Sequence, residues 1–170
     1  KGPFTQHLKI CSVEKEAAKL GDIKNVFFKL RHNLLNVLLA QSIVNAIHKK
    51  EIVLNLEKLS APPGRFQIVE ATANSFAVVD YAHTPDAIEK VISSVRNSFP
   101  NHGVRTLFGC GGNRDKEKRA MMGEVACNLS DFCYITSDNP REEDPQEIID
   151  EILTGIVGGN YKMHVDRAFA

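Results

Sequence analysis

Residues 104–119 read VRTLFGCGGNRDKEKR, an apolar run followed by a glycine-rich, charged loop. The run Val104 to Phe108 has the length of a buried strand, and the glycines after it let the backbone turn sharply. A helix is predicted to follow from about Arg119 to Asn128, and then a second apolar strand from Phe132 to Thr136. This strand–helix–strand order is typical of a parallel sheet with helices packed on it.

The same alternation continues on both sides of this unit. The further elements predicted are strands over 66–71, 76–80 and 161–165, a helix opened by Thr84-Pro85 and another opened by Asp144-Pro145. Threonine and aspartate can accept a backbone N–H as N-caps, and proline suits the first helical position. The sequence therefore predicts an α/β fold with a Rossmann-like, mostly parallel sheet and flanking helices.

The first sixty residues are less regular. Residues 8–10 and 26–30 could form short strands, and apolar residues at helical spacing predict a helix from about Asn33 to His48. Its apolar stripe would be exposed if parts of its domain lay outside this chain. The break Ala61-Pro62-Pro63-Gly64 then predicts a domain boundary, with residues 1–61 in one domain and 62–170 in the next.

Composition narrows the class of protein. Lys plus Arg and Asp plus Glu are balanced at 21 each, which does not favour nucleic acid or a membrane surface as partner. No apolar run approaches the roughly 18 residues of a membrane span. The four cysteines form no C-x-x-C pair, and we interpret them as free thiols in a reducing compartment. The absence of an initiator Met and the end at Ala170 suggest a piece of a larger protein.

Three predicted loops are rich in Asp, Arg, His and Gly: 80–86, 109–118 and 137–144. In a parallel sheet, ligands bind outside the carboxyl ends of the strands. Asp80 ends a strand and could hold a ribose hydroxyl or a metal-bound water. His83 precedes a helix N-terminus, which favours anions. Helix capping explains the neighbours of these two residues but not the residues themselves.

The second loop brings four cations to one helix start: Arg114, Lys116, Lys118 and Arg119. Cations there oppose the helix dipole, so we expect an anionic ligand such as a carboxylate or phosphate; the alternative is a solvated basic loop. A dinucleotide fingerprint is weak, because the third glycine position is Arg114 and the next strand's terminal acid comes late. A nicotinamide enzyme is therefore a distant alternative. No P-loop motif occurs in the chain.

The third loop contains Ser137-Asp138-Asn139-Pro140-Arg141. Asp138 can bind an ammonium group, and Arg141 can hold a carboxylate through two hydrogen bonds. Asn139 offers both a donor and an acceptor. Together they are complementary to an amino-acid head group. The alternative is an Asx-turn beside a surface arginine.

Seven segments together resemble the Mur ligase family, in particular its MurE-type branch, the UDP-N-acetylmuramoyl-tripeptide synthetases. They are Pro63-Gly64-Arg65, Val79 to Ala87, Phe108 to Gly112, Arg114-Asp115-Lys116, Lys118-Arg119, Met122-Gly123 and Ser137 to Arg141. They keep the order and spacing of that family from about residue 63 to residue 145. Upstream, His32-Asn33-Leu34-Leu35-Asn36 is similar to the element that ends the family's central ATP-binding domain.

The resemblance implies that residues 62–170 form the C-terminal amino-acid-binding domain, preceded by the end of the central ATP-binding domain. It implies a cytoplasmic, monomeric ligase that uses ATP and Mg²⁺ to add meso-diaminopimelate to UDP-MurNAc-L-Ala-D-Glu through an acyl phosphate. Matching positions assign ATP contacts to Asn36, Arg65, Asp80 and His83. They assign diaminopimelate contacts to Arg114, Asp138, Asn139, Pro140 and Arg141. The match assigns no catalytic residue or metal ligand within the chain.

The match also has departures and gaps. Asn113, Glu117 and Ala120 replace the family's usual Asp, Gly and Pro. The P-loop, the modified lysine that helps hold magnesium and the late G-K-G-H-E segment fall outside the chain, so we expect the chain to be inactive alone. Arg141 favours diaminopimelate, because it can pair with that ligand's second carboxylate but would repel lysine's second ammonium. The open alternatives are a non-enzymatic binding module on the same fold and a related Mur-type ligase that adds lysine or glutamate.

Overall fold

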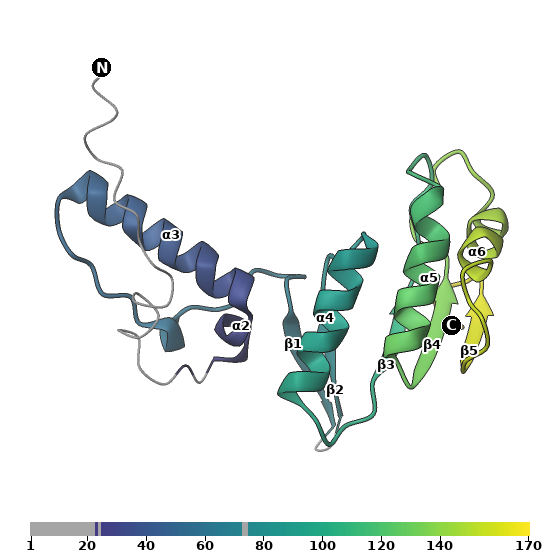
Figure 1. Cartoon of the computed structure of the whole chain (residues 1–170), viewed down its shortest axis with the longest axis horizontal. Coiled ribbons are helices and arrows are strands. Elements are labelled where there is room, and N and C mark those ends of the chain that lie inside the picture. Colours follow the sequence, from purple (N-terminus) through teal and green to yellow (C-terminus); the bar gives the residue numbers. More distant parts are fainter. Residues whose placement is uncertain (1–22, 24, 73–74) are drawn as a thin grey trace. The chain divides into compact units, whose positions relative to one another are not determined.

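The computed structural model describes residues 23, 25–72 and 75–170, and the chain divides into two compact units between Pro63 and Gly64 (Figure 1). We describe each unit by itself. Across the described ranges, none of the helices has the length and apolar character needed to cross a lipid bilayer. The predicted strand at 8–10 lies outside the described residues.

The first unit is helical. It contains α2 (Val26–Lys29), α3 (Arg31–His48) and the short 3-10 helix η1 (Leu56–Lys58). The prediction of a strand at 26–30 is wrong, because the Asn25 side chain accepts a hydrogen bond from the backbone N–H of Phe27 at 3.1 Å and starts a helix there. The helix predicted from Asn33 is confirmed as α3.

Much of the apolar surface of α3 is exposed. Leu38 is buried, whereas Leu39, Ile43 and Ile47 are 62%, 52% and 70% exposed. These values agree with the expectation that the stripe of this helix would be uncovered. An apolar face of this kind is typical of a surface that packs against another element.

The second unit has the predicted alternation. Its elements are β1 (Gln67–Thr72), β2 (Ser75–Val79), α4 (Pro85–Ser98), β3 (Arg105–Phe108), α5 (Glu117–Leu129), β4 (Phe132–Thr136), α6 (Pro145–Leu153) and β5 (Tyr161–His164). The three last strands form a parallel sheet in the order β3-β4-β5, with Thr106 beside Cys133 and Cys133 beside Tyr161. The α/β class with a parallel sheet is thus confirmed.

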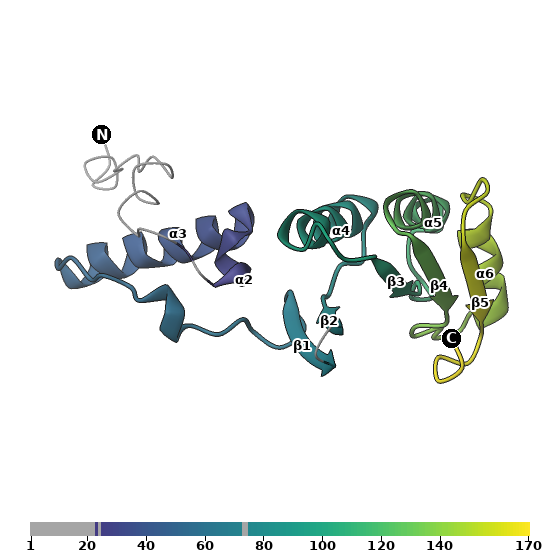
Figure 2. The same cartoon turned by 90° about the horizontal axis from the view of Figure 1, so that it is seen from below.

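The strand β2 does not belong to that sheet. It pairs antiparallel with β1, and Gln67 lies opposite Val79 (Figures 1 and 2). The alternation had placed 76–80 at the start of the parallel sheet, and this part of the prediction is wrong. The connection from β1 to β2 is too short for the crossover that parallel strands need, so the two strands form a hairpin. The loop 80–86 therefore leaves a hairpin strand.

The helix N-caps explain where α4 and α6 begin. The Thr84 hydroxyl accepts the backbone N–H of Ala87 at 3.3 Å, as predicted. The Asp144 carboxylate accepts the backbone N–H of Gln146 at 2.7 Å. Pro85 and Pro145 occupy the first turns, where the missing N–H is no loss.

The core lies between the parallel sheet and its helices, with α5 packed between α4 and α6 (Figure 2). Its fully buried members, at 0% exposure, are Ala126, Cys133, Ile135, Ile149 and Ile152. Gly123 allows α5 and α6 to approach closely, since a Cβ there would lie 2.4 Å from the backbone oxygen of Ile152. This contact joins the middle of α5 to the last turn of α6, and the loops described next lead into these two helices.

Replacing Ile149 by alanine should lower the free energy of unfolding by about 2–5 kcal/mol, because it leaves a cavity in this core. Urea unfolding followed by circular dichroism measures the loss. Ile149→Val removes one methylene and should lose only about 0.5–1.5 kcal/mol. Equal effects of the two variants would contradict this account of the core.

Candidate functional site

Two loops touch where β3 and β4 end. The backbone N–H of Gly112 donates to the carbonyl oxygen of Asn139 at 2.8 Å. A Cβ at residue 112 would lie 1.8 Å from the carbonyl oxygen of Pro140, so only glycine fits at this contact. The parallel pairing of β3 with β4 brings both loops to one edge of the sheet. Of the three loops predicted at one edge of the parallel sheet, 109–118 and 137–144 thus meet, whereas 80–86 follows the β1–β2 hairpin instead.

Arg119 lies beneath these loops with only 1% of its surface exposed. Its guanidinium forms a two-pronged pair with Glu143, with Nη1–Oε2 and Nη2–Oε1 distances of 2.8 and 2.9 Å. Nη1 also donates to Glu151 Oε2 at 2.7 Å. Hydrogen bonding to Glu143 is the main reason that the pKa of Arg119 is raised further above its already high value. The same pairing, with the Asn113 N–H as second donor, lowers the pKa of Glu143 to about 2.

The other cations of the loop are also paired. Lys116 Nζ lies 3.3 Å from Glu143 and 3.1 Å from Glu151, and Lys118 lies 3.0 Å from Asp115. The expectation that four cations await an anionic ligand is therefore wrong for Lys116, Lys118 and Arg119. Carboxylates of the same domain neutralise them. Of the four, Arg114 has no ion pair within the described part of the chain.

Arg114 and Arg141 both have side-chain atoms beside Gly111. A Cβ at Gly111 would lie 3.8 Å from Arg114 Cγ and 3.9 Å from Arg141 Nη1. Both arginine side chains are exposed, and Arg141 donates one N–H to the carbonyl oxygen of Gly112. The structure thus brings two of the predicted amino-acid contacts together and leaves most of their donors available.

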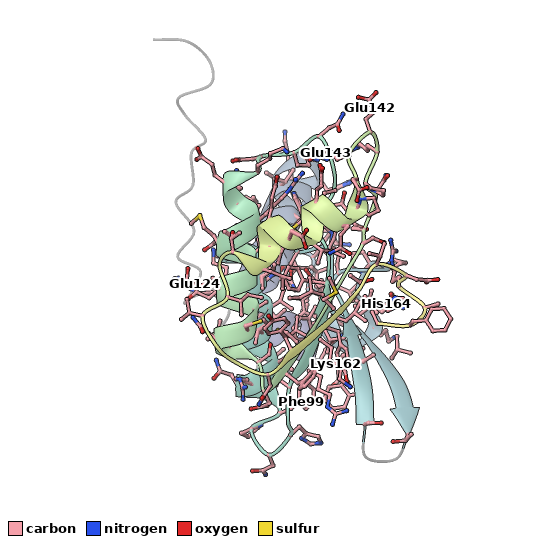
Figure 3. All side chains as sticks on the ribbon, turned by 90° about the vertical axis from the view of Figure 1, so that its right-hand side faces the viewer. Phe99, Glu124, Glu142, Glu143, Lys162 and His164 are labelled. Atoms are coloured by element: carbon pink, nitrogen blue, oxygen red, sulfur yellow. The ribbon has the colours of Figure 1, made fainter. Side chains whose placement is uncertain are left out.

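The rest of the third loop is exposed or shaped by its own backbone. Asp138 lies 3.6 Å from Arg167, with 55% of its side chain exposed. Pro140 accepts the backbone N–H of Glu143 at 3.0 Å, which closes a turn around Arg141. Within that turn Arg141 has a φ of +51°, a left-handed backbone that non-glycine residues rarely adopt. Figure 3 shows Glu142 and Glu143 at one end of the domain and Phe99 at the other.

A second cluster forms around Tyr81. The Arg65 guanidinium lies 4.8 Å from the centre of the Tyr81 ring, and the His83 ring lies 5.2 Å from it. His83 Nδ1 is 3.0 Å from the carbonyl oxygen of Tyr81. Because a carbonyl only accepts, this contact places the proton on Nδ1 and leaves Nε2 as an acceptor. Tyr81 itself is 59% exposed and was not singled out from the sequence.

Asp80 has a structural partner that the sequence did not reveal. Its Oδ2 accepts the backbone N–H of Phe66 at 2.8 Å, and Phe66 has a φ of +46°. One carboxylate oxygen therefore holds the base of the hairpin. Asn36 is exposed on α3, in the other unit.

Comparisons with known proteins bear on these loops. A family model described as "Mur ligase, glutamate ligase domain" matches residues 64–170. The chain is similar to a UDP-N-acetylmuramoyl-L-alanyl-D-glutamate–2,6-diaminopimelate ligase of Alkaliphilus oremlandii, at 47% identity over 71% of this chain and 25% of that one. It is similar to the ligase of the same name from Leptospira interrogans, at 54% identity over 68% of this chain and 23% of that one. The chain thus spans about a quarter of the length of these relatives.

Solved structures give the same picture. The structure of a UDP-N-acetylmuramoyl-L-alanyl-D-glutamate–2,6-diaminopimelate ligase aligns with a TM-score of 0.55 and 33% identity, over 79% of this chain and 28% of that one. A folylpolyglutamate synthase from Thermotoga maritima aligns with a TM-score of 0.60 over 80% of this chain and 32% of that one. At 19% identity, this second likeness concerns the fold alone.

Glu143 should make stability depend on pH in a defined window. Folding lowers its pKa from 4.5 to about 2, so its contribution is complete above about pH 4.5 and is lost as the pH falls toward 2. The difference in melting temperature between wild type and Glu143→Gln should therefore be constant above pH 4.5 and shrink below it. Calorimetric melting at a series of pH values measures this difference. Glu124→Gln, at an exposed position of α5, is the control and should show no such window.

Proposed function

The chain belongs to the Mur ligase family, and from this membership we propose that it carries the amino-acid-binding side of an ATP-dependent ligase. The ligase joins meso-diaminopimelate to the D-Glu carboxylate of UDP-MurNAc-L-Ala-D-Glu. Residues 62–170 would be its C-terminal domain, and residues 1–61 the end of its ATP-binding domain. The names of the relatives from Alkaliphilus and Leptospira, both 2,6-diaminopimelate ligases, support this substrate.

One observation supports the proposal: Arg114 and Arg141 both lie beside Gly111, with Arg114 Cγ and Arg141 Nη1 at 3.8 and 3.9 Å from the position that a Cβ there would take. Gly111 belongs to the loop that touches the Asp138–Arg141 loop. Arg141 donates one N–H to Gly112 and retains others for a two-pronged bond to a carboxylate. The exposed carboxylate of Asp138 can receive an ammonium group. Diaminopimelate has two amino and two carboxylate groups, whereas lysine offers one carboxylate. Two nearby arginines therefore favour diaminopimelate.

The Tyr81 cluster suits the nucleotide. Arg65 can meet phosphate oxygens while its guanidinium stays over the Tyr81 ring. His83 can accept a ribose hydroxyl at Nε2, and the Asp80 oxygen not bonded to Phe66 can do the same or hold a metal-bound water. The family resemblance also implies that Asn36 contacts adenine.

ATP would donate its γ-phosphoryl group to the D-Glu carboxylate and leave as ADP, and the amine of diaminopimelate would then displace phosphate from the acyl phosphate. ATP and Mg²⁺ would both be bound mainly outside this chain. The described residues contain no group of three or more His, Cys, Asp or Glu side chains able to hold a metal. We therefore assign these residues a role in binding and orientation. Holding the incoming amine near the acyl carbon replaces a bimolecular encounter by a local one, which is a large part of the acceleration in such reactions.

A non-enzymatic binding module on this fold, or a ligase that adds lysine or glutamate, would use the same loops differently. A module would bind diaminopimelate without forming an amide. A lysine-adding ligase would gain nothing from Arg141, because a cation beside the second ammonium of lysine is repulsive. Product formation with each amino acid separates these cases.

Arg141→Ala in the full-length protein should weaken meso-diaminopimelate binding by about 10- to 100-fold, since it removes a charge-assisted contact. Isothermal titration calorimetry measures the affinity. Lysine binding should not weaken. The control is Arg105→Ala, an exposed arginine at the opposite end of β3, which should change neither affinity. Equal weakening for both amino acids would contradict the specificity.

His83→Ala should raise the KM for ATP by about tenfold, the effect of losing one polar contact. The KM for diaminopimelate should stay near the wild-type value, because His83 contacts Tyr81 rather than Arg114 or Arg141 among the described residues. Steady-state kinetics measures both constants. His102→Ala, at another exposed histidine beside Phe99, is the control. An unchanged KM for ATP would remove His83 from the nucleotide site.

A further inference from the structure

We propose that Arg119 is a positioning residue for the amino-acid site, acting through Glu143 on the turn that carries Arg141. The proposal rests on the function proposed above. Arg119 does not touch the substrate in this scheme. It fixes the backbone from which Arg141 and Asp138 reach the ligand.

The burial of Arg119 calls for an explanation. A guanidinium that is 1% exposed is strongly desolvated, and such a group is retained only when it is well paired. Its pairing is nearly complete: Nη1 donates to Glu143 and Glu151, and Nη2 donates to Glu143 and to the Gly111 carbonyl at 3.2 Å. Its Nε has no partner in the described part of the chain.

These partners lie on three different segments. Gly111 belongs to the glycine-rich loop, Glu143 to the loop after β4, and Glu151 to α6. Glu143 returns a bond to the first loop, because its carboxylate accepts the backbone N–H of Asn113. Arg119 and Glu143 therefore tie the two loops together from below, beside the direct Gly112–Asn139 contact.

One member of the Arg119–Glu143 pair belongs to the turn that contains Arg141. The backbone N–H of Glu143 closes this turn on Pro140 at 3.0 Å, so Glu143 is both the last residue of the turn and the partner of Arg119. Arg141 adopts its φ of +51° inside the turn. A left-handed backbone at a non-glycine residue persists only where its surroundings enforce it. The fixed Glu143 side chain provides that enforcement.

Stability alone does not account for this network. Desolvation offsets most of the attraction in a buried ion pair, and well-packed apolar residues often stabilise a core equally well. What an apolar residue cannot supply is direction. A planar guanidinium bonded in two prongs fixes both the distance and the orientation of Glu143. The network therefore contributes geometry at the site.

The test uses four variants of the full-length protein: Arg119→Met, Arg119→Lys, Glu143→Gln and Glu151→Gln. Arg119→Met should raise the KM for meso-diaminopimelate by about 10- to 100-fold and leave the KM for ATP near its wild-type value, since displaced contacts cost that much. Arg119→Lys keeps the charge without the two-pronged geometry and should recover part of the loss. Glu143→Gln should raise the KM for meso-diaminopimelate more than Glu151→Gln does, because only Glu143 belongs to the turn.

Ile149→Val is the control for lost stability, since Ile149 lies in the core and takes no part in the hydrogen bonds that join the two loops. Its KM for diaminopimelate should not change. A rise in both KM values for Arg119→Met, or effects of the four variants that follow only their melting temperatures, would overturn the proposal. If Arg119→Met does not fold, the comparison of Glu143→Gln with Glu151→Gln decides instead. Equal KM values for diaminopimelate in these two variants would overturn the proposal.

Hydrogen exchange separates this inference from the proposed function. In the ligand-free protein, the amides of Gly112 and Asn113 should exchange about tenfold faster or more in Arg119→Met than in wild type, because their bonds link the two loops. If wild type forms no amide with diaminopimelate but this exchange difference is found, only the proposed function fails. If wild type is active and neither exchange nor KM responds to Arg119, only the positioning role fails.

Discussion

The contact of two bare backbones at the end of β3 and β4 is the constraint on which the site depends. Parallel pairing puts Phe108 beside Ile135, so the chain leaves both strands at the same edge. Gly112 then donates to Asn139, and a side chain at that glycine would collide with Pro140. Because the two loops meet in this way, an arginine from each lies beside Gly111. Neither loop alone could present both charges.

Electrostatic balance decides which of those charges remain free. Five cations lie in or beside the two loops, and a ligand can use only those that the protein has not already paired. Glu143 and Glu151 pair with Arg119 and Lys116, and Asp115 pairs with Lys118. Arg114 and Arg141 are left exposed near Gly111. The acidic residues of the domain thus pair with three of the five cations and leave Arg114 and Arg141 without an ion pair among the described residues.

Much of this fold could be predicted, because it depends on local signals. Hydrophobic period located both ends of β3 and β4 to within a residue, and N-caps with prolines located the first residues of α4 and α6. Pairing over long sequence distance could not be predicted. Glu143 and Glu151 lie 24 and 32 residues from Arg119 in the sequence. Local signals therefore predicted Arg119 to be an unpaired cation of a basic loop. The pairing of β2 with β1, by contrast, is local, because only a short turn joins the two strands and Thr72 lies opposite Ser75.

The Tyr81 cluster could also have been predicted only in part from the sequence. Tyr81 stands between Asp80 and His83, and an aromatic side chain in a polar loop is a signal for a stacking surface. Its importance depends on Arg65, which lies across the hairpin and which only the fold brings over the ring.

The two clusters also depend on different supports. The Tyr81 cluster is held by the β1–β2 hairpin through the bond from Phe66 to Asp80, whereas the Arg114–Arg141 cluster is held by the parallel sheet and Arg119. The helix α4 connects them, because it begins at the Thr84 cap beside His83 and buries Ile88 and Ile92 in the core of the sheet. The residues of the two clusters can therefore vary independently while one helix keeps their supports together. This arrangement lets the loop after β4 change without disturbing the Tyr81 cluster.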